Sequence, residues 1–160
     1  MCDITIQFIA EARKYLTSSY LPKIERCLDE LSDEDVWWRA GEASNSIGNL
    51  LLHLNGSTRT WIVSVAGNSP SERDRQGEFD EREQIPRAEF IARLKQTLAE
   101  TDAVLANLTP EQMLERRQSP WGEVTVLGAV FHAVEHFSMH AGQIFMLTKM
   151  RAAKDLNLSD

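Results

Sequence analysis

Residues 124–154 read VTVLGAVFHAVEHFSMHAGQIFMLTKMRAAK, and this stretch decides the fold. Its apolar side chains recur at spacings of three and four, which predicts an amphipathic α-helix. They occupy nearly every face of that helix, and the polar exceptions are the histidines, Glu135, Ser138 and Gln143. A helix that is apolar almost all round is buried by its neighbours. We therefore expect other helices of the chain to cover it.

Three further segments have the same periodicity: residues 3–31, 47–66 and 86–108. Pro22 is expected to kink the first of them, because proline removes a backbone donor and clashes with the preceding turn. Residues 67–85 are polar and charged, and we predict a long surface crossover there. Four long segments predict an all-α four-helix bundle in one domain, residues 1–160. This crossover allows an up-down-down-up order of helices as well as a simple up-down one.

Strand signals are weak. Residues 118–123, with Pro120 and Gly122, are predicted to form a turn, and residues 123–126 are too short to anchor a sheet. Gly56 and Gly142 lie inside predicted helices, where a missing side chain allows neighbouring backbones to approach closely.

Composition and charge exclude several classes of protein. The 160 residues carry a formal net charge of −7, and no Lys/Arg run exceeds the pair Arg116-Arg117, so neither nucleic acid nor an anionic membrane surface is an expected partner. No apolar run approaches the roughly 20 residues of a membrane span, and the N-terminus lacks the pattern of a signal peptide. Cys2 and Cys27 show no Cys-x-x-Cys spacing, so we expect two free thiols and a cytoplasmic protein.

The four histidines are the clearest functional signal. His136 and His140 are one helical turn apart and face the same way, and His132 extends their stripe. On the second long segment, His53 lies between Asn49 and Ser57, so a second polar stripe runs through a leucine-rich helix. Buried polar groups are costly unless they are paired. Two such stripes can meet around a metal ion held by three neutral imidazoles, with positions left open for other ligands.

Two other interpretations use the same residues. The histidines could be structural, hydrogen-bonded to carbonyls and hydroxyls within a metal-free helical dimer. Residues 132–136 also match His-x-x-Glu-His, a pattern in which zinc peptidases use the glutamate as a general base. That second interpretation is disfavoured because no glutamate follows Glu135 to act as a further ligand, and because it leaves His53 and His140 without a role. Glu135 is instead interpreted as an ion-pair partner.

Two stretches resemble the DinB/YfiT-like metal-binding proteins. Residues 46–56, SIGNLLLHLNG, followed by Trp61-Ile62, are similar to that family's second-helix signature. Residues 134–144, VEHFSMHAGQI, are similar to its last-helix signature, and the two signatures occur in the expected order. The resemblance covers essentially the whole chain. It implies a four-helix bundle of up-down-down-up topology, with a long crossover between the second and third helices.

The resemblance also implies a divalent metal ion, usually nickel or zinc. Its ligands would be His53, His136 and His140. His132 lies outside this matched triad and could support a metal ligand, contact a substrate or be a structural histidine. Asn49 could orient a ligand histidine or cap a neighbouring turn. Trp61 is expected in the core, and Trp121 could border the site or a dimer face. Homodimers are common in the family, and characterised members include S-transferases that use a low-molecular-weight thiol and thiol-dependent isomerases.

The resulting hypothesis is a metal-dependent transferase that joins a low-molecular-weight thiol to small electrophiles. A bound cation lowers the pKa of a coordinated thiol or water, so it can generate either nucleophile near neutral pH. The alternatives are a metal-dependent hydrolase and a non-catalytic metal-binding or stress-related protein. No catalytic residue is assigned, and the residues leave the metal, the thiol and the electrophile open.

Overall fold

The computed structural model describes residues 4–70 and 72–158, and these are mainly helical, as predicted. The first segment is one long rod, built from α1 (Ile4–Lys14), the π-helical stretch η1 (Tyr15–Tyr20) and α2 (Leu21–Asp29). Its π turns lie directly before Pro22, whose ring would clash with the carbonyl four residues earlier in a regular α-helix. The helix therefore responds to the proline by widening over η1.

The second and fourth segments carry the histidines. α4 (Ile47–Thr58) continues as the π-helical stretch η2 (Arg59–Ala66), and α8 (Val126–Ala152) extends over 27 residues. Each helix begins at a hydroxyl cap: the side-chain oxygens of Ser46 and Thr125 accept from the backbone amide three residues later, at 3.1 and 3.0 Å. Such caps satisfy amides that have no partner within the helix, so both helices start at a defined residue.

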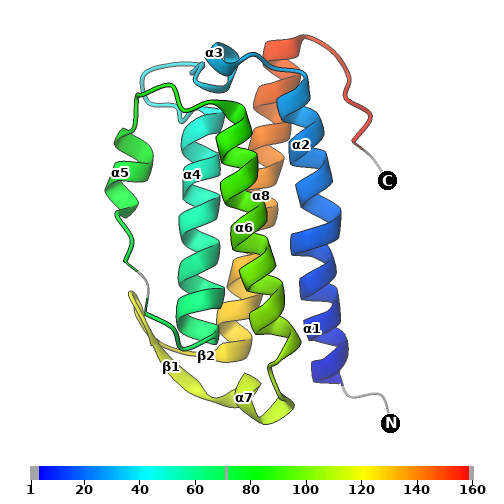
Figure 1. Cartoon of the computed structure of the whole chain (residues 1–160), viewed down its shortest axis with the longest axis vertical. Coiled ribbons are helices and arrows are strands. Elements are labelled where there is room, and N and C mark those ends of the chain that lie inside the picture. The colour runs from blue at the N-terminus through cyan, green and yellow to red at the C-terminus, as the bar shows by residue number, and fades with distance from the viewer. Residues whose placement is uncertain (1–3, 71, 159–160) are drawn as a thin grey trace.

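The long helices form an up-down-down-up bundle. Figure 1 shows α1 to α2 running up the view, α4 with η2 running down, α6 (Arg87–Ala106) running down and α8 running up. The short helices α3 (Asp33–Val36) and α7 (Pro110–Leu114) lie at opposite ends of the bundle (Figure 1). The crossover returns the chain to the top, so that the second and third long helices are parallel.

The core lies between these four helices. Each contributes side chains that are at most 2% exposed, for example Leu16, Ile62, Leu98 and Phe137. Cys27 is buried with its thiol free, and burial raises the pKa of that thiol. This agrees with the prediction of a packed thiol, whereas Cys2 lies outside the described residues.

The crossover contains a helix that the sequence analysis did not predict. α5 (Arg75–Asp80) lies along the outer side of α4 (Figure 1). The side-chain amide of Asn49 donates to the carbonyl oxygens of Glu78 at 2.9 Å, Phe79 at 3.4 Å and Glu81 at 3.2 Å. A polar segment without a core of its own is thus fastened to a buried position of α4.

Residues 118–123 are more than a turn, and this corrects the prediction. β1 (Arg116–Ser119) and β2 (Gly122–Thr125) pair antiparallel, with Arg116 opposite Thr125 and Ser119 opposite Gly122. Pro120 and Trp121 form the loop, and Gly122 has φ of 116°, a conformation that favours glycine. The last helix consequently starts at Val126, two residues later than predicted. The strands escaped prediction because RRQS and GEVT lack an alternating apolar pattern.

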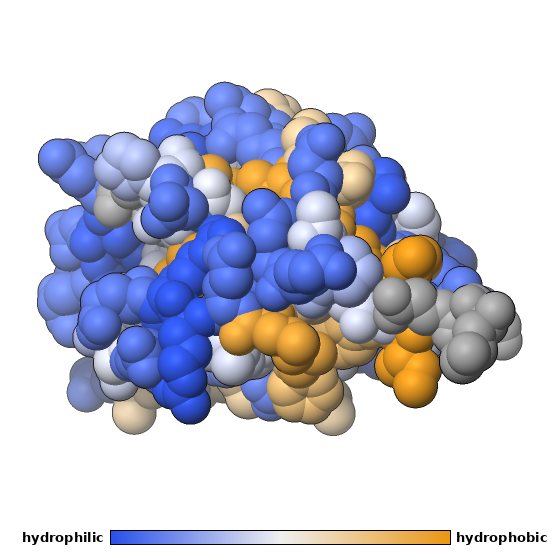
Figure 2. All heavy atoms as spheres, turned by 90° about the horizontal axis from the view of Figure 1, so that it is seen from below, coloured by the Kyte–Doolittle hydropathy of each residue, from blue (hydrophilic) through white to orange (hydrophobic). Residues whose placement is uncertain are grey.

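Figure 2 looks at the end of the bundle that carries the hairpin, and hydrophilic side chains cover most of this face, with smaller apolar areas between them. Among the described residues, no helix is both long enough and apolar enough to cross a membrane. The two glycines predicted to allow close packing differ. A Cβ at Gly56 would collide with the Glu78 carboxylate, whereas a Cβ at Gly142 would meet nothing within 4 Å, so the prediction is wrong for Gly142.

Candidate metal centre and the adjoining cavity

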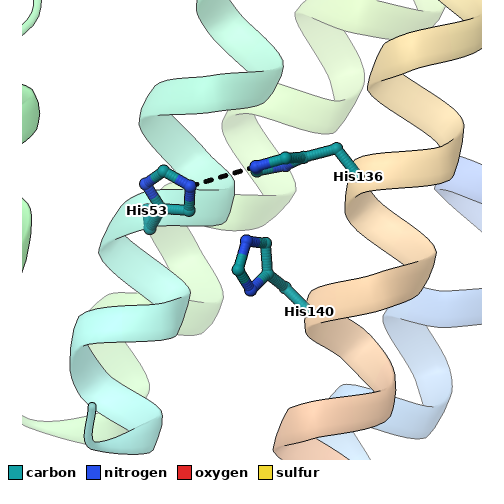
Figure 3. Close-up of side chains that lie close together, drawn as sticks. All are labelled: His53, His136 and His140. Carbon is teal, nitrogen blue, oxygen red and sulfur yellow. Dashed lines mark hydrogen bonds between the residues drawn. The ribbon is translucent and has the colours of Figure 1, made fainter. Parts of the chain in front are cut away.

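Three histidines from two helices meet at one point. His53 projects from α4, and His136 and His140 project from α8, with all three rings turned toward each other (Figure 3). One nitrogen of each ring lies within 4.8 Å of the others, and the Nε2 atoms of His53 and His136 are 3.1 Å apart. Zinc–nitrogen bonds of about 2.0–2.1 Å would place two ligands of one ion roughly 3.3 Å apart. The three imidazoles therefore fit a divalent metal ion.

The outer nitrogens of two rings are held by oxygen atoms. His53 Nδ1 is 2.9 Å from Glu78 Oε2, and His140 Nδ1 is 2.7 Å from Gln143 Oε1. Both oxygens accept hydrogen bonds, so the proton of each ring belongs on Nδ1. A protonated Nδ1 leaves the Nε2 lone pair for a metal, the usual arrangement around ligand histidines.

Glu78 is itself held by an arginine of the crossover. Arg73 donates from Nε to Oε1 at 2.6 Å and from Nη2 to Oε2 at 2.7 Å, and both side chains are nearly buried. Burial would raise the pKa of Glu78, but the hydrogen bonds from Arg73 and His53 outweigh it and lower that pKa. The carboxylate fits because Gly56 has no side chain: a Cβ there would lie 2.0 Å from Glu78 Oε1.

Burial favours the neutral form of His136 and His140. The pKa of His136 is lowered from 6.5 to about 3, mainly by burial and then by the neighbouring His140, His53 and His132 and by Arg73. The pKa of His140 is also lowered, mainly by burial. Neutral imidazole is the form that binds metal, so these two residues need not lose a proton to become ligands near neutral pH.

His132 and Asn49 lie outside the cluster. His132 is one turn before His136, and its ring centroid lies 4.3 Å from that of Trp61 and 5.4 Å from that of His136. The hydrogen bonds of Asn49 run to Ser46, Arg39 and the carbonyls of the crossover, so it supports α5 and makes no hydrogen bond to a histidine. Its link to the cluster is indirect, through the segment that carries Glu78.

Glu135 does not face the cluster. Its side chain is 54% exposed, and its nearest histidine partner is His132 Nδ1 at 3.9 Å. The ion-pair interpretation of Glu135 therefore fits its position. A general-base role within His-x-x-Glu-His gains no support from this geometry.

A cavity of about 420 Å³ opens beside the cluster. Trp61 and Trp121 stack along it, with centroids 5.4 Å apart and planes at 11°. Trp61 is buried, as predicted, whereas Trp121 on the hairpin loop is 61% exposed. The lining consists of imidazole, guanidinium, indole and hydroxyl groups, from His53, Ser57, Trp61, Arg73, Arg75, Trp121, His132 and His136.

The crossover residues at this site were missed by sequence reasoning. Arg73, Arg75 and Glu78 lie in a polar run without helical periodicity, which is typical of a solvated surface segment. An available signal was the short Asp74-x-x-Gly77 turn, where the Asp74 carboxylate accepts from the Gly77 amide at 2.9 Å and starts α5. That signal predicts a local helix start, but it does not show which helix α5 packs against.

Comparisons with known proteins identify the relatives. The family model described as mycothiol-S-transferase matches residues 13–150. A DinB-like protein of Bacillus subtilis, YjoA, has a TM-score of 0.68 at 18% identity, over 91% of this chain and 94% of that one. A conserved protein of Enterococcus faecalis has a TM-score of 0.65 at 15% identity, over 94% of this chain and 96% of that one. At these identities the two structures show a shared fold.

A curated relative has a different description. The CRISPR-associated endonuclease Cas9 of Actinomyces naeslundii is 29% identical over 141 residues, which cover 80% of this chain. The match covers only 13% of the length of that endonuclease.

Proposed function

Because the chain belongs to the DinB-like mycothiol S-transferase family, we propose that it is a metal-dependent transferase that joins a low-molecular-weight thiol to small electrophiles. The observation that carries this proposal is the cluster of His53, His136 and His140 at the wall of a cavity. Three imidazole ligands leave coordination positions open, as catalytic rather than structural sites do. The cavity gives a second reactant access to those positions.

The proposed ligands are these three histidines, and the proposed ion is nickel or zinc. When bound, the ion lowers the pKa of a thiol and so supplies a thiolate near neutral pH. Glu78 and Gln143 hold the rings of His53 and His140 by their Nδ1 atoms. The thiol proton leaves to solvent, and the sulfur then forms a bond to the electrophilic carbon. That carbon either releases a leaving group, which departs with the bonding electron pair, or passes a π-electron pair to the neighbouring atom, which takes a proton from solvent.

The cavity walls position the reactants. Trp61 and Trp121 offer flat apolar surfaces against which an electrophile can pack, and they reduce the access of water. His132 lines the same cavity beside Trp61, so we propose that it contacts the substrate. Asn49 acts through the crossover, by donating hydrogen bonds to the backbone carbonyls of Glu78 and Phe79.

The proposal also extends to the partners of the protein and to its place in the cell. The net charge of −7 argues against a nucleic-acid partner, and the short match to the endonuclease supplies no reason to propose one. We place the protein in the cytoplasm, where its free buried thiol would stay reduced. A homodimer is proposed because α8 exposes Phe131, Met139, Met146 and Met150 on its outer side.

Metal content and thiol consumption test the proposal together. Protein purified without a nickel column should carry about one metal ion per chain by elemental mass spectrometry, and His136→Ala should carry almost none. His132→Ala is the matched control, since it removes an imidazole one turn away and should keep the ion. Metal-loaded wild type should consume thiol in the presence of an electrophile panel, and a chelator should stop the reaction.

The other outcomes distinguish the alternatives. A bound metal ion without turnover across several thiols would favour a non-catalytic metal-binding protein. Chelator-sensitive hydrolysis without thiol consumption would favour a hydrolase that activates water at the same position. Absence of metal after reloading would overturn the metal centre and leave a helical bundle with structural histidines.

A further inference from the structure

The cavity beside the histidines is lined by cationic and neutral groups although the chain is acidic. Two arginines and three histidines contribute to it, and no carboxylate is among its described lining residues. The whole chain nevertheless has 24 acidic residues against 17 basic ones. Glu78, which contacts two of these lining residues, already accepts two hydrogen bonds from Arg73 and one from His53. The open part of the wall is therefore positive.

Arg75 is the source of that positive charge. Its neighbour Arg73 is neutralised by Glu78, whereas Arg75 has no hydrogen bond or ion pair with any acidic residue in the described part of the chain. Its guanidinium instead lies over the Phe79 ring, 5.2 Å from the centroid. Stacking on a ring leaves the guanidinium edge available for a planar, two-point hydrogen bond, and carboxylates match that geometry.

A second cavity meets the first at this arginine. It has a volume of about 410 Å³, shares Arg73, Arg75 and Trp121 with the first, and continues toward the hairpin. The rest of its described lining is hydroxyl, amide and apolar groups, again without a carboxylate. Arg75 thus lies where a ligand that reaches from the histidines toward the hairpin would pass.

We infer that Arg75 forms an anion subsite, and that the ligands of this site carry a carboxylate a few bonds from the reacting sulfur. The inference rests on the proposed function for the identity of the reacting atom, but the subsite itself rests on the unpaired guanidinium and the two joined cavities. The carboxylate could belong to the thiol or to the electrophile. A carboxylate on either reactant would bind Arg75 in the same way, and the two compound pairs distinguish the thiol from the electrophile.

Two matched pairs of thioethers probe the subsite without a thiol that can bind metal. The first pair is S-methyl-N-acetylcysteine, which carries a carboxylate on the thiol half, and the corresponding carboxamide, which is neutral. In the second pair, N-acetylcysteamine carries either an S-carboxymethyl or an S-carbamoylmethyl group, so the charge is on the half derived from the electrophile. Binding is followed by the fluorescence of the stacked tryptophans and by calorimetry, in zinc-loaded and metal-free protein.

Wild type should bind the anionic compound of one pair about ten-fold more tightly than the neutral compound. A difference of this size is expected from one charge-assisted hydrogen bond. Arg75→Gln should bind both members equally, with the neutral affinity unchanged, and Arg75→Lys should keep part of the preference. Arg93→Gln, an exposed arginine on α6 outside both cavities, controls for net charge. The pair that shows the preference identifies which reactant carries the carboxylate.

Failure of this inference and failure of the proposed function differ in outcome. Equal binding within both pairs, or a preference that survives in Arg75→Gln, would overturn the subsite even if the protein binds zinc and consumes thiol. A preference that is lost only in the Arg75 variants would support the subsite, even in a protein that never binds metal.

Discussion

Each clustered histidine has a different set of contacts. His53 contacts a carboxylate through its outer nitrogen and His140 contacts an amide oxygen, whereas the hydrogen-bond contact of His136 is with the His53 imidazole. Burial, together with the neighbouring histidines and Arg73, lowers the pKa of His136 to about 3. Protonation of this residue should therefore oppose folding.

The stability of the metal-free protein should depend on pH through His136. Between pH about 3 and 6.5 the unfolded chain holds a proton that the folded chain does not, so the free energy of unfolding rises with pH and levels off above 6.5. His140 acts in the same direction because its pKa is also lowered. Urea midpoints by circular dichroism should fall steadily from pH 6.5 toward 4, and less steeply in His136→Gln. An identical slope in the two proteins would contradict this.

Among individual residues, the sequence predicted those of the candidate site that lie on long helices but not those that lie in the crossover. The meeting of His53, His136 and His140 could be predicted because helical spacing and order along the chain place them on facing stripes. Arg75 and Glu78 could not, because their positions depend on the docking of α5 on α4, and no periodicity encodes that contact. Asn49 was found as a polar residue on the right face, but its hydrogen bonds run to crossover carbonyls.

At the scale of elements, the crossover and α4 form one unit. Glu78 enters the space above Gly56, where an added Cβ would lie 2.0 Å from Oε1 and 2.8 Å from Arg73 Nε. We expect Gly56→Ala to displace the carboxylate from His53 and to weaken zinc binding about ten-fold, the usual effect of losing a partner of a ligand histidine. Competition titration against a chromogenic chelator measures this.

Gly142→Ala is the matched control for that substitution. Gly142 also lies inside a long helix, and its added Cβ would meet nothing within 4 Å. Both changes gain helix propensity, roughly 1 kcal/mol for Gly to Ala, so a difference between them in zinc affinity isolates the contact with Glu78. Equal zinc affinity in both variants would show that the carboxylate is dispensable for His53.

Helices were predicted well where burial of one face imposes a regular spacing of apolar residues. The four long helices follow from apolar spacings of three and four, whereas α5 and the hairpin have no such pattern. β1 and β2 are held by pairing between the strands and by the Pro120-Trp121 loop, and in the loop the Ser119 hydroxyl accepts from the Trp121 amide at 3.2 Å. Local turn chemistry of this kind outweighed the weak strand propensity of RRQS.

At the scale of the whole molecule, the exposed side of α8 bears on assembly. Phe131, Met139, Met146 and Met150 are 47–61% exposed and lie within an arc of about 100° on that helix. Clustered exposed apolar side chains mark interaction surfaces more often than scattered ones do. We expect light scattering to give a dimer for wild type and a monomer for the double variant Phe131→Glu with Met146→Glu. Leu114→Glu, which changes a leucine on α7 that is 73% exposed, should remain a dimer.

The path of the crossover has one more consequence. Gly67, Asn68, Ser69 and Pro70 are exposed, and they separate the part of the chain that holds His53 from the part that holds Glu78, His136 and His140. A protein cut there would become two fragments, each with an incomplete set of donors. Rejoining of the fragments would then be linked to the concentration of the proposed ion, because the full set of three imidazoles exists only in their complex. The chain could thus serve as a split reporter, in which metal is the signal for complementation.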